Sequence, residues 1–445
     1  MIQFRSGFYA DVRVEDRSRT VISYKAGALE EMRNRREKQA FLRVYDGKLW
    51  YYASTTDTDR LQKTLDGLYA AATENPAILE DPVVKRFEKN QDKVYTFADC
   101  SVRDIPLAEK QKLLLGYLPV LTEDSCVVLP TGTYLDRNSQ FHFLSSLGAD
   151  IEYDYQTCGL SFGFSMAEGE KQFQGSWQKG GTRFDEMTGI EGELRESVKE
   201  QANFLRNSVP AEPGKYPVVL SPMAAGVFAH ESFGHKSESD FMISDETMKE
   251  EWQLGKTVGS PILSIAEYGN IVGSGFVPYD DEGTKARQNY LIKNGVLAGR
   301  LHSAMTAAVL DEGLTGNARA IDCTFEPIVR MTTTYIEGGD LDFDQLIAPI
   351  EKGYFIKTIN HGSGMSTFTI APSVSYEIVN GKLGRPVQIS VITGSVFETL
   401  GLIDGLTKDV ELLSFVTGGC GKMEQSGLPV GFGGPYVRVS SMNVQ

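Results

Sequence analysis

The chain has 445 residues, of which 44 are Lys or Arg and 59 are Asp or Glu, and its formal net charge is −15 at pH 7. This length exceeds one ordinary hydrophobic core, so we expect two or three domains, and 41% hydrophobic residues are enough to fill them. The negative charge argues against a nucleic-acid-binding protein, because that binding depends on Lys and Arg neutralising phosphates.

Alternating apolar and polar residues predict an antiparallel meander at the start of the chain. Its strands are expected at 9–14, 20–24, 41–45 and 49–52, with a turn at residues 46–47. A helix is expected next, at 60–72, because Leu61, Leu65 and Leu68 recur at helical spacing. Asp57 is its predicted N-cap.

A second group of elements is expected from about residue 105. A helix at 107–115 begins it, and a charged helix at 191–207 ends it. Strands are predicted between them, at 125–129, 140–144, 151–155 and 160–164. Because helices and strands do not alternate strictly, the expected fold class is α+β.

Residues 210–215 are rich in proline and glycine and mark the expected domain boundary. We expect an N-terminal α+β region over 1–209, which could consist of two units at about 1–100 and 101–209. A larger, glycine-rich and β-dominated C-terminal domain is expected over 210–445. Its glycine clusters lack the GxGxxG and GxxxxGK[ST] patterns of nucleotide-binding loops, so they indicate bulges and tight turns.

The opening residues lack the long apolar core of a signal peptide, and the sequence contains no run of about 18 apolar residues. We therefore expect a cytoplasmic protein that does not bind or cross a membrane. The five cysteines are scattered without CxxC spacing, which indicates reduced thiols rather than a disulfide framework.

Residues 230–240, HESFGHKSESD, carry the strongest chemical signal in the sequence. His230 and His235 are imidazoles of the kind that hold zinc, and Glu231 is a carboxylate able to take a proton from a metal-bound water. The alternative is a histidine packed against apolar residues and a second histidine in solvent. Only five histidines occur in the chain, so their chance clustering beside a glutamate is improbable. The segment predicts a metal site.

The five-residue spacing is unusual, because a straight helix would turn His235 about 140° away from His230. Two local structures correct this: a π-helical turn, or a helix that ends at Gly234 so that His235 swings back. We favour the second. Ser221 as N-cap and Pro222 at the first helical position predict a short helix that leads into the motif.

A catalytic zinc site usually has three protein ligands and one open position, so a third ligand is needed. The candidates are two nearby carboxylates, two downstream histidines and two cysteines: Glu238, Asp240, His302, His361, Cys323 and Cys420. Cys420 is the best thiol candidate on local grounds, because its glycine neighbours leave space for a metal. A carboxylate ligand remains open.

Several segments give the chain a resemblance to the TldD/PmbA family of metallopeptidases, long labelled modulators of DNA gyrase. The motif segment resembles the family's HExxGHxxExD signature. Further similar segments follow it at 280–284, 291–297, 316–319, 327–331 and 418–431. The resemblance is strongest from about residue 215 onward and weak before about 190.

The resemblance implies an active peptidase with zinc on His230, His235 and Cys420. It also implies that Glu231 is the general base, and that the substrates are short or unfolded peptides cleaved in an enclosed cavity. Family members work as dimers, so a homodimer or a heterodimer with a family paralogue is expected. Arg319 and Arg330 are expected to have structural roles rather than to hold substrate.

Two classes of function remain open from the sequence. One is the zinc peptidase, and the other is a non-catalytic binding or regulatory protein of the same fold with a structural metal or none. A metal-dependent amidase with non-peptide substrates is a weaker third possibility.

Overall fold

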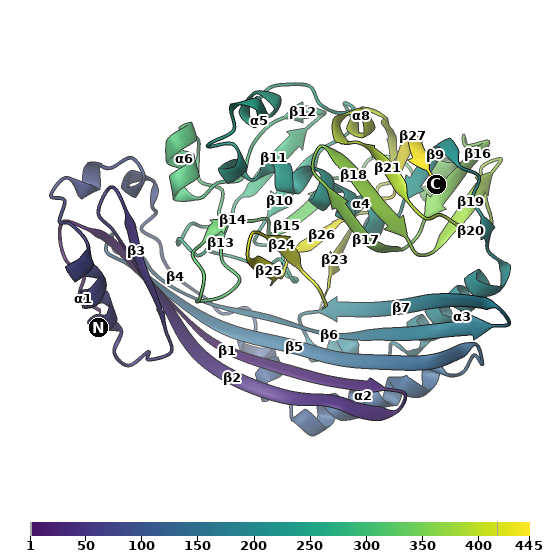
Figure 1. The fold of residues 1–445 in the computed structure, drawn as a ribbon, viewed down its shortest axis with the longest axis horizontal. Helices are drawn as coiled ribbons and strands as arrows, with labels where there is room; N and C mark the ends of the chain where they lie inside the picture. Colours follow the sequence, from purple (N-terminus) through teal and green to yellow (C-terminus); the bar gives the residue numbers. More distant parts are fainter. Residues whose placement is uncertain (1, 416) are drawn as a thin grey trace.

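The computed structural model describes residues 2–415 and 417–445. Their strands form three larger sheets and two short two-stranded ones (Figure 1). The architecture is α+β, as the sequence predicted. No helix in the described part of the chain is long and apolar enough to span a bilayer.

The N-terminal sheet has the strand order β3-β2-β1-β5-β6-β4, with β7 paired to β6, so strands from both sides of residue 100 share it. Its strands are β1 (Tyr9–Lys25), β2 (Ala28–Tyr45), β3 (Trp50–Thr55), β4 (Gln91–Val94), β5 (Val127–Ser145), β6 (Asp150–Glu168) and β7 (Lys171–Gly181). The predicted antiparallel meander is confirmed by the β1–β2 and β2–β3 pairings.

The long strands of this sheet differ from the prediction, which divided them into short ones. β1, β2, β5 and β6 are 17 to 19 residues long, and the polar stretches expected to be loops lie inside them. Cross-strand ion pairs explain why charged residues are tolerated there: Arg36 pairs with Asp16 at 2.6 Å and Arg17 with Glu37 at 2.5 Å.

Two helices cover one face of the N-terminal sheet and leave its other face toward the C-terminal sheets (Figure 1). They are α2 (Leu107–Leu121), longer than predicted, and α3 (Glu191–Asn207), as predicted. α1 (Leu61–Ala71) packs near β2 and β3. The prediction of Asp57 as its cap is wrong, because Arg60 is the N-cap and Asp57 accepts from the Arg60 guanidinium at 2.6 Å.

The C-terminal residues build a ten-stranded and a six-stranded sheet. The ten-stranded sheet consists of β8 (Val209–Pro210), β9 (Gly214–Leu220), β16 (Lys352–Ile356), β17 (Ile359–Gly364), β18 (Thr367–Pro372), β19 (Ser375–Val379), β20 (Lys382–Gln388), β21 (Ile392–Ser395), β22 (Ile403–Leu406) and β27 (Val437–Val444). The six-stranded sheet consists of β10 (Ile265–Tyr268), β11 (Gln288–Lys293), β12 (Val296–Leu297), β15 (Thr333–Ile336), β23 (Glu411–Ser414) and β26 (Gly431–Gly434).

The remaining elements are short. The two-stranded sheets are β13 (Ala318–Arg319) with β14 (Ile328–Val329) and β24 (Cys420–Lys422) with β25 (Gln425–Leu428). The C-terminal helices are α4 (Pro222–Ala229), α5 (Glu246–Glu251), α6 (Ala304–Leu310), α7 (Phe343–Ile347) and α8 (Val396–Gly401).

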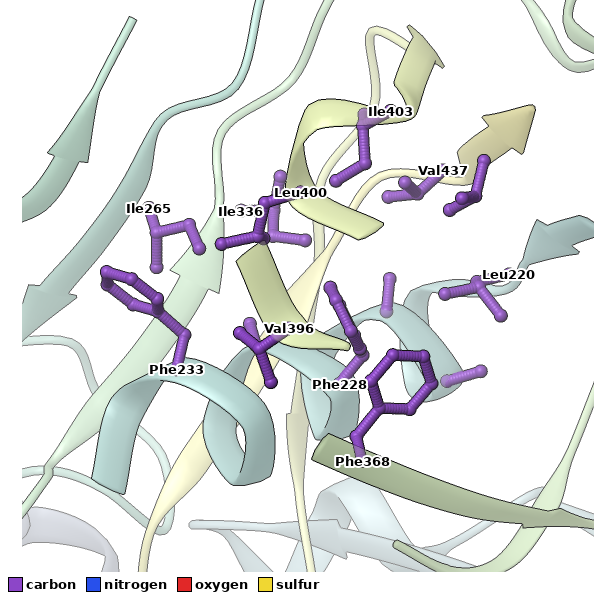
Figure 2. Close-up of a cluster of buried hydrophobic side chains, with 14 of the residues drawn as sticks. Leu220, Phe228, Phe233, Ile265, Ile336, Phe368, Val396, Leu400, Ile403 and Val437 are labelled. Carbon is purple, nitrogen blue, oxygen red and sulfur yellow. The ribbon is translucent and has the colours of Figure 1, made fainter. Parts of the chain in front are cut away.

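Helix α4 lies between the two large C-terminal sheets, in contact with β15 and β26 on one side and β9 and β17 on the other. The helix begins as predicted. The Ser221 hydroxyl accepts a hydrogen bond from the Ala224 N–H, and Pro222 is the first helical residue. Phe228 of α4 is fully buried, and its ring meets the Phe368 ring edge-on at 5.0 Å (Figure 2). Phe233, five residues on, is also fully buried and packs on Trp252.

The helix does not end at Gly234, so that prediction is wrong. Residues His230–Gly234 form a π-helical turn, closed by the His235 N–H donating to the His230 carbonyl, and a 3₁₀ turn at His235–Ser237 follows. Gly234 keeps a right-handed helical conformation, with φ −57°. A Cβ on it would lie 2.1 Å from the Met331 sulfur, so the Met331 side chain would have to shift to admit a larger residue.

Gly234→Ala should lower the free energy of unfolding by about 1–3 kcal/mol, because the added methyl overpacks a buried contact. Combining it with Met331→Ala should cost less than the sum of the two single changes, since the smaller side chain makes room. Urea denaturation of the four proteins measures this. If Gly234 were needed to end the helix instead, the costs of the two single changes would simply add in the double variant.

Candidate metal centre

The structure brings His230, His235 and Cys420 together. One ligand atom from each lies within 4.8 Å of the others, and the Cys420 Sγ is 3.4 Å from the His235 Nε2. The two imidazole rings stand nearly perpendicular, at 78° with centroids 5.1 Å apart. The π-helical turn makes this possible, since its wider turn returns residues five apart to almost the same face.

The three side chains perturb one another strongly. Burial alone would raise the pKa of Cys420, but the charges and hydrogen bonds of both histidines outweigh it and lower the pKa to about 5. Burial likewise disfavours charge on the histidines, yet the pKa of each is raised by the thiolate beside it. The cluster therefore favours a thiolate, and it stabilises positive charge next to that thiolate.

Glu238 orients the ring of His235 by contacting the ring nitrogen that faces away from Cys420. Its carboxylate lies 3.1 Å from the His235 Nδ1. Burial would raise the pKa of Glu238, but the hydrogen bond with His235 and the charge of Lys422 lower it below its usual range. An ionised carboxylate only accepts hydrogen bonds, so Nδ1 carries a proton, and Nε2 is the ring nitrogen that faces Cys420 and would bind a metal.

A buried lysine links this carboxylate to the strand that carries Cys420. The Lys422 ammonium lies 3.1 Å from Glu238 and 2.7 Å from Asp240, and it donates to the Val329 carbonyl at 2.8 Å. Its side chain is only 2% exposed. Sequence reasoning missed this role, because Lys422 stands in a glycine-rich segment where a lysine is ordinarily a solvent residue.

The hairpin of β24 and β25 presents Cys420. Gly418 and Gly419 precede the cysteine with positive φ angles of 89° and 146°, and a Cβ on Gly419 would lie 2.6 Å from the backbone of Gly427. These glycines are therefore needed for the chain path. Arg330 is fully buried and donates to the Cys420 carbonyl at 2.8 Å, which holds the backbone of the cysteine in place.

Arg330 thus has the structural role that the sequence predicted, and so does Arg319, which donates to the carbonyls of Met331 and Pro429.

Glu231 lies at the edge of the cluster. Its carboxylate is 4.0 Å from the His235 Nε2 and its side chain is 30% exposed. Glu231, His230 and Cys420 line a cavity of about 1320 Å³ between the N-terminal sheet and the C-terminal sheets. A ligand in this cavity can therefore reach the carboxylate and the cluster at once.

The other candidate ligands lie elsewhere. His302 is buried in hydrogen-bonding distance of Ser239, Thr306 and Glu312. His361 is exposed on β17 and lines the same cavity without joining the cluster. Cys323 lies 3.9 Å from the Arg13 carbonyl. Asp240 pairs with Lys422 rather than with the histidines.

The donor set fits zinc. Zinc prefers imidazole nitrogen and thiolate sulfur, and two such ligands of a tetrahedral ion lie roughly 3.5 Å apart, close to the sulfur–nitrogen distance seen here. The His230 Nδ1 is buried and lacks a hydrogen-bond partner among the described residues, so part of that ring is left unsatisfied by protein. Three protein donors leave one position open.

Comparison with known proteins gives the family. The model of the PmbA/TldA metallopeptidase C-terminal domain matches residues 213–445, and the model of its domain 1 matches residues 10–72. The chain belongs to the PmbA/TldD metallopeptidase family. It is 33% identical to a protein of Methanothermobacter thermautotrophicus named a metalloprotease, over 98% of this chain and 95% of that one.

Other relatives agree with this assignment. A protein of Saccharolobus solfataricus named a zinc metalloprotease TldD homolog is 30% identical over 70% of each chain. The fold matches the crystal structure of a putative modulator of a DNA gyrase from Thermotoga maritima, with TM-score 0.77, 19% identity and coverage of 99% and 96%. TldE from Thermococcus kodakarensis matches with TM-score 0.76, 14% identity and coverage of 98% and 96%.

Glu238→Gln should weaken zinc binding by about 10–100-fold, because a neutral amide no longer fixes the proton on the His235 Nδ1. Glu312→Gln is the matched control, since it removes the same kind of contact, at 2.9 Å, from His302. Competition with a chromogenic chelator measures both affinities. Equal losses in the two variants would contradict the role given to Glu238.

Proposed function

We propose that this chain is a zinc-dependent peptidase that hydrolyses short or unfolded peptides in the cavity beside the His230–His235–Cys420 cluster. The observation that carries the proposal is the convergence of three zinc-type donors, of which His230 and Cys420 line the cavity, with the Glu231 carboxylate on the same cavity wall. The names of the relatives support a metalloprotease, and one of those names specifies zinc.

Glu231 is the general base of this proposal. Its carboxylate lies at the cavity edge, 4.0 Å from the His235 Nε2, so it accepts a proton from a water that attacks a peptide carbonyl in the cavity. The same carboxyl group then returns that proton to the leaving amine. Zinc, when bound, supplies Lewis acidity that activates the water and stabilises negative charge on the carbonyl oxygen.

The thiolate of Cys420 lowers the net charge of the metal site compared with a third imidazole. A bound metal would then supply less activation of the attacking water, so proton removal depends more strongly on Glu231. His230 and His235 keep their nitrogen donors on a helical turn buried in the core, which limits their movement.

The alternative is a non-catalytic binding protein with a structural metal. A structural zinc site normally has four protein ligands, whereas the cluster among the described residues has three. Glu231 further favours catalysis, because holding zinc does not require a carboxylate that faces the cavity.

Glu231→Gln should keep stoichiometric zinc and lose peptide cleavage by at least about 100-fold, the usual contribution of a general base. Cys420→Ser should lose zinc affinity together with activity. Cleavage of a mixed library of short peptides by mass spectrometry, with metal analysis of each protein, measures both results.

Cys126→Ser is the control for the cysteine change, because Cys126 is buried in the N-terminal core outside the cavity lining. It should retain both zinc and cleavage. Full cleavage by zinc-loaded Glu231→Gln would refute the proposed base. A wild-type protein that binds no zinc under reducing, chelator-free conditions would refute the peptidase itself.

A further inference from the structure

The cavity wall opposite the metal cluster carries three arginines. Arg17 and Arg19 of β1 and Arg137 of β5 line the cavity that Glu231 and Cys420 line from the other side. Arg19 and Arg137 are direct neighbours in the β1–β5 register, and Arg19 also pairs in register with Arg35 of β2. Guanidinium groups placed side by side in this way repel one another.

Nearby carboxylates neutralise two of these three arginines. Arg137 lies 2.7 Å from Glu15, and Arg17 lies 2.5 Å from Glu37. Arg19 forms no ion pair within the part of the chain that the structure describes. Desolvation, followed by the charges of Arg137 and Arg17, lowers the pKa of Arg19, so this guanidinium lies in a locally positive environment.

Two of the carboxylates that line the cavity have cationic partners of their own. Glu193 pairs with Lys179 at 2.8 Å and Glu200 with Lys357 at 2.5 Å. A protein of net charge −15 thus places, in the lining of this cavity, an arginine without an ion-pair partner among the described residues. The Arg19 side chain is exposed to solvent, and it lines this cavity, where a ligand can reach it.

We propose that Arg19, flanked by Arg17 and Arg137, binds a carboxylate of the peptide substrate while the scissile bond lies at the metal cluster. This inference rests on the proposed peptidase function and names the substrate class: peptides with a carboxylate at a set distance from the cleaved bond. A guanidinium donates two parallel hydrogen bonds to a carboxylate, which gives both affinity and register. That carboxylate can be an Asp or Glu side chain or the C-terminus of the peptide.

A matched set of quenched fluorescent peptides tests the inference on the zinc-loaded protein. The reference peptide is uncharged and amidated. One series adds a single Glu at successive positions, and a second form carries a free C-terminal carboxylate. For wild type, the best carboxylate peptide should be cleaved with about tenfold higher kcat/KM than the reference, mainly through a lower KM.

Arg19→Glu should bring this selectivity ratio to about one or below, and a Lys peptide should then be preferred. Arg60→Glu is the control: Arg60 is exposed outside the cavity lining, and its ratio should equal that of wild type. If one Glu position is preferred, the bound carboxylate is that of a side chain. If the free C-terminus is preferred, the bound carboxylate is the terminal one of the peptide. An unchanged ratio in Arg19→Glu, or equal cleavage of all peptides by wild type, would overturn the inference.

Measurements of peptide binding distinguish a failure of this inference from a failure of the proposed peptidase function on which it rests. If wild type cleaves none of the peptides, the proposed function fails, and fluorescence anisotropy of the same peptides decides the inference. Tighter binding of carboxylate peptides to wild type, lost in Arg19→Glu and kept in Arg60→Glu, supports it. Equal binding to the three proteins contradicts it.

Discussion

The hydrogen bond from the His235 N–H to the His230 carbonyl is the constraint on which the candidate metal centre depends. It closes a turn of five residues, and this turn places both imidazoles on one side of the helix. The turn is held because Phe233 inside it is fully buried on Trp252 and Gly234 touches Met331. Packing in the core therefore stabilises a backbone geometry that is rare in isolated helices.

A second constraint joins the helical turn to a hairpin 185 residues away in the chain. Two buried cations hold the hairpin in place. Lys422 pairs with Glu238, and Arg330 donates to the Cys420 carbonyl. Buried charges without partners are costly, so the cationic groups and their acceptors must assemble together. The ligand positions are thus coupled to the folding of the whole C-terminal region.

The sequence predicted which side chains come together better than it predicted the backbone geometry that brings them together. His230, Glu231 and His235 were found from spacing and residue type, and Cys420 from its glycine neighbours and a family resemblance. The π-helical turn was not the favoured choice, because local rules treat Gly234 as a stop, whereas its neighbour Met331 is distant in sequence. The charged half of β2 was missed because its partners, such as Asp16, lie on another strand.

The metal coordination of the purified, zinc-loaded protein tests the central claim most directly. Zinc X-ray absorption spectroscopy should show two nitrogen ligands at about 2.0–2.1 Å and one sulfur at about 2.3 Å, with one further light-atom ligand from solvent. The sulfur contribution should vanish in Cys420→Ser. A zinc ion without sulfur in the wild-type protein, or one that keeps its sulfur in Cys420→Ser, would contradict the account.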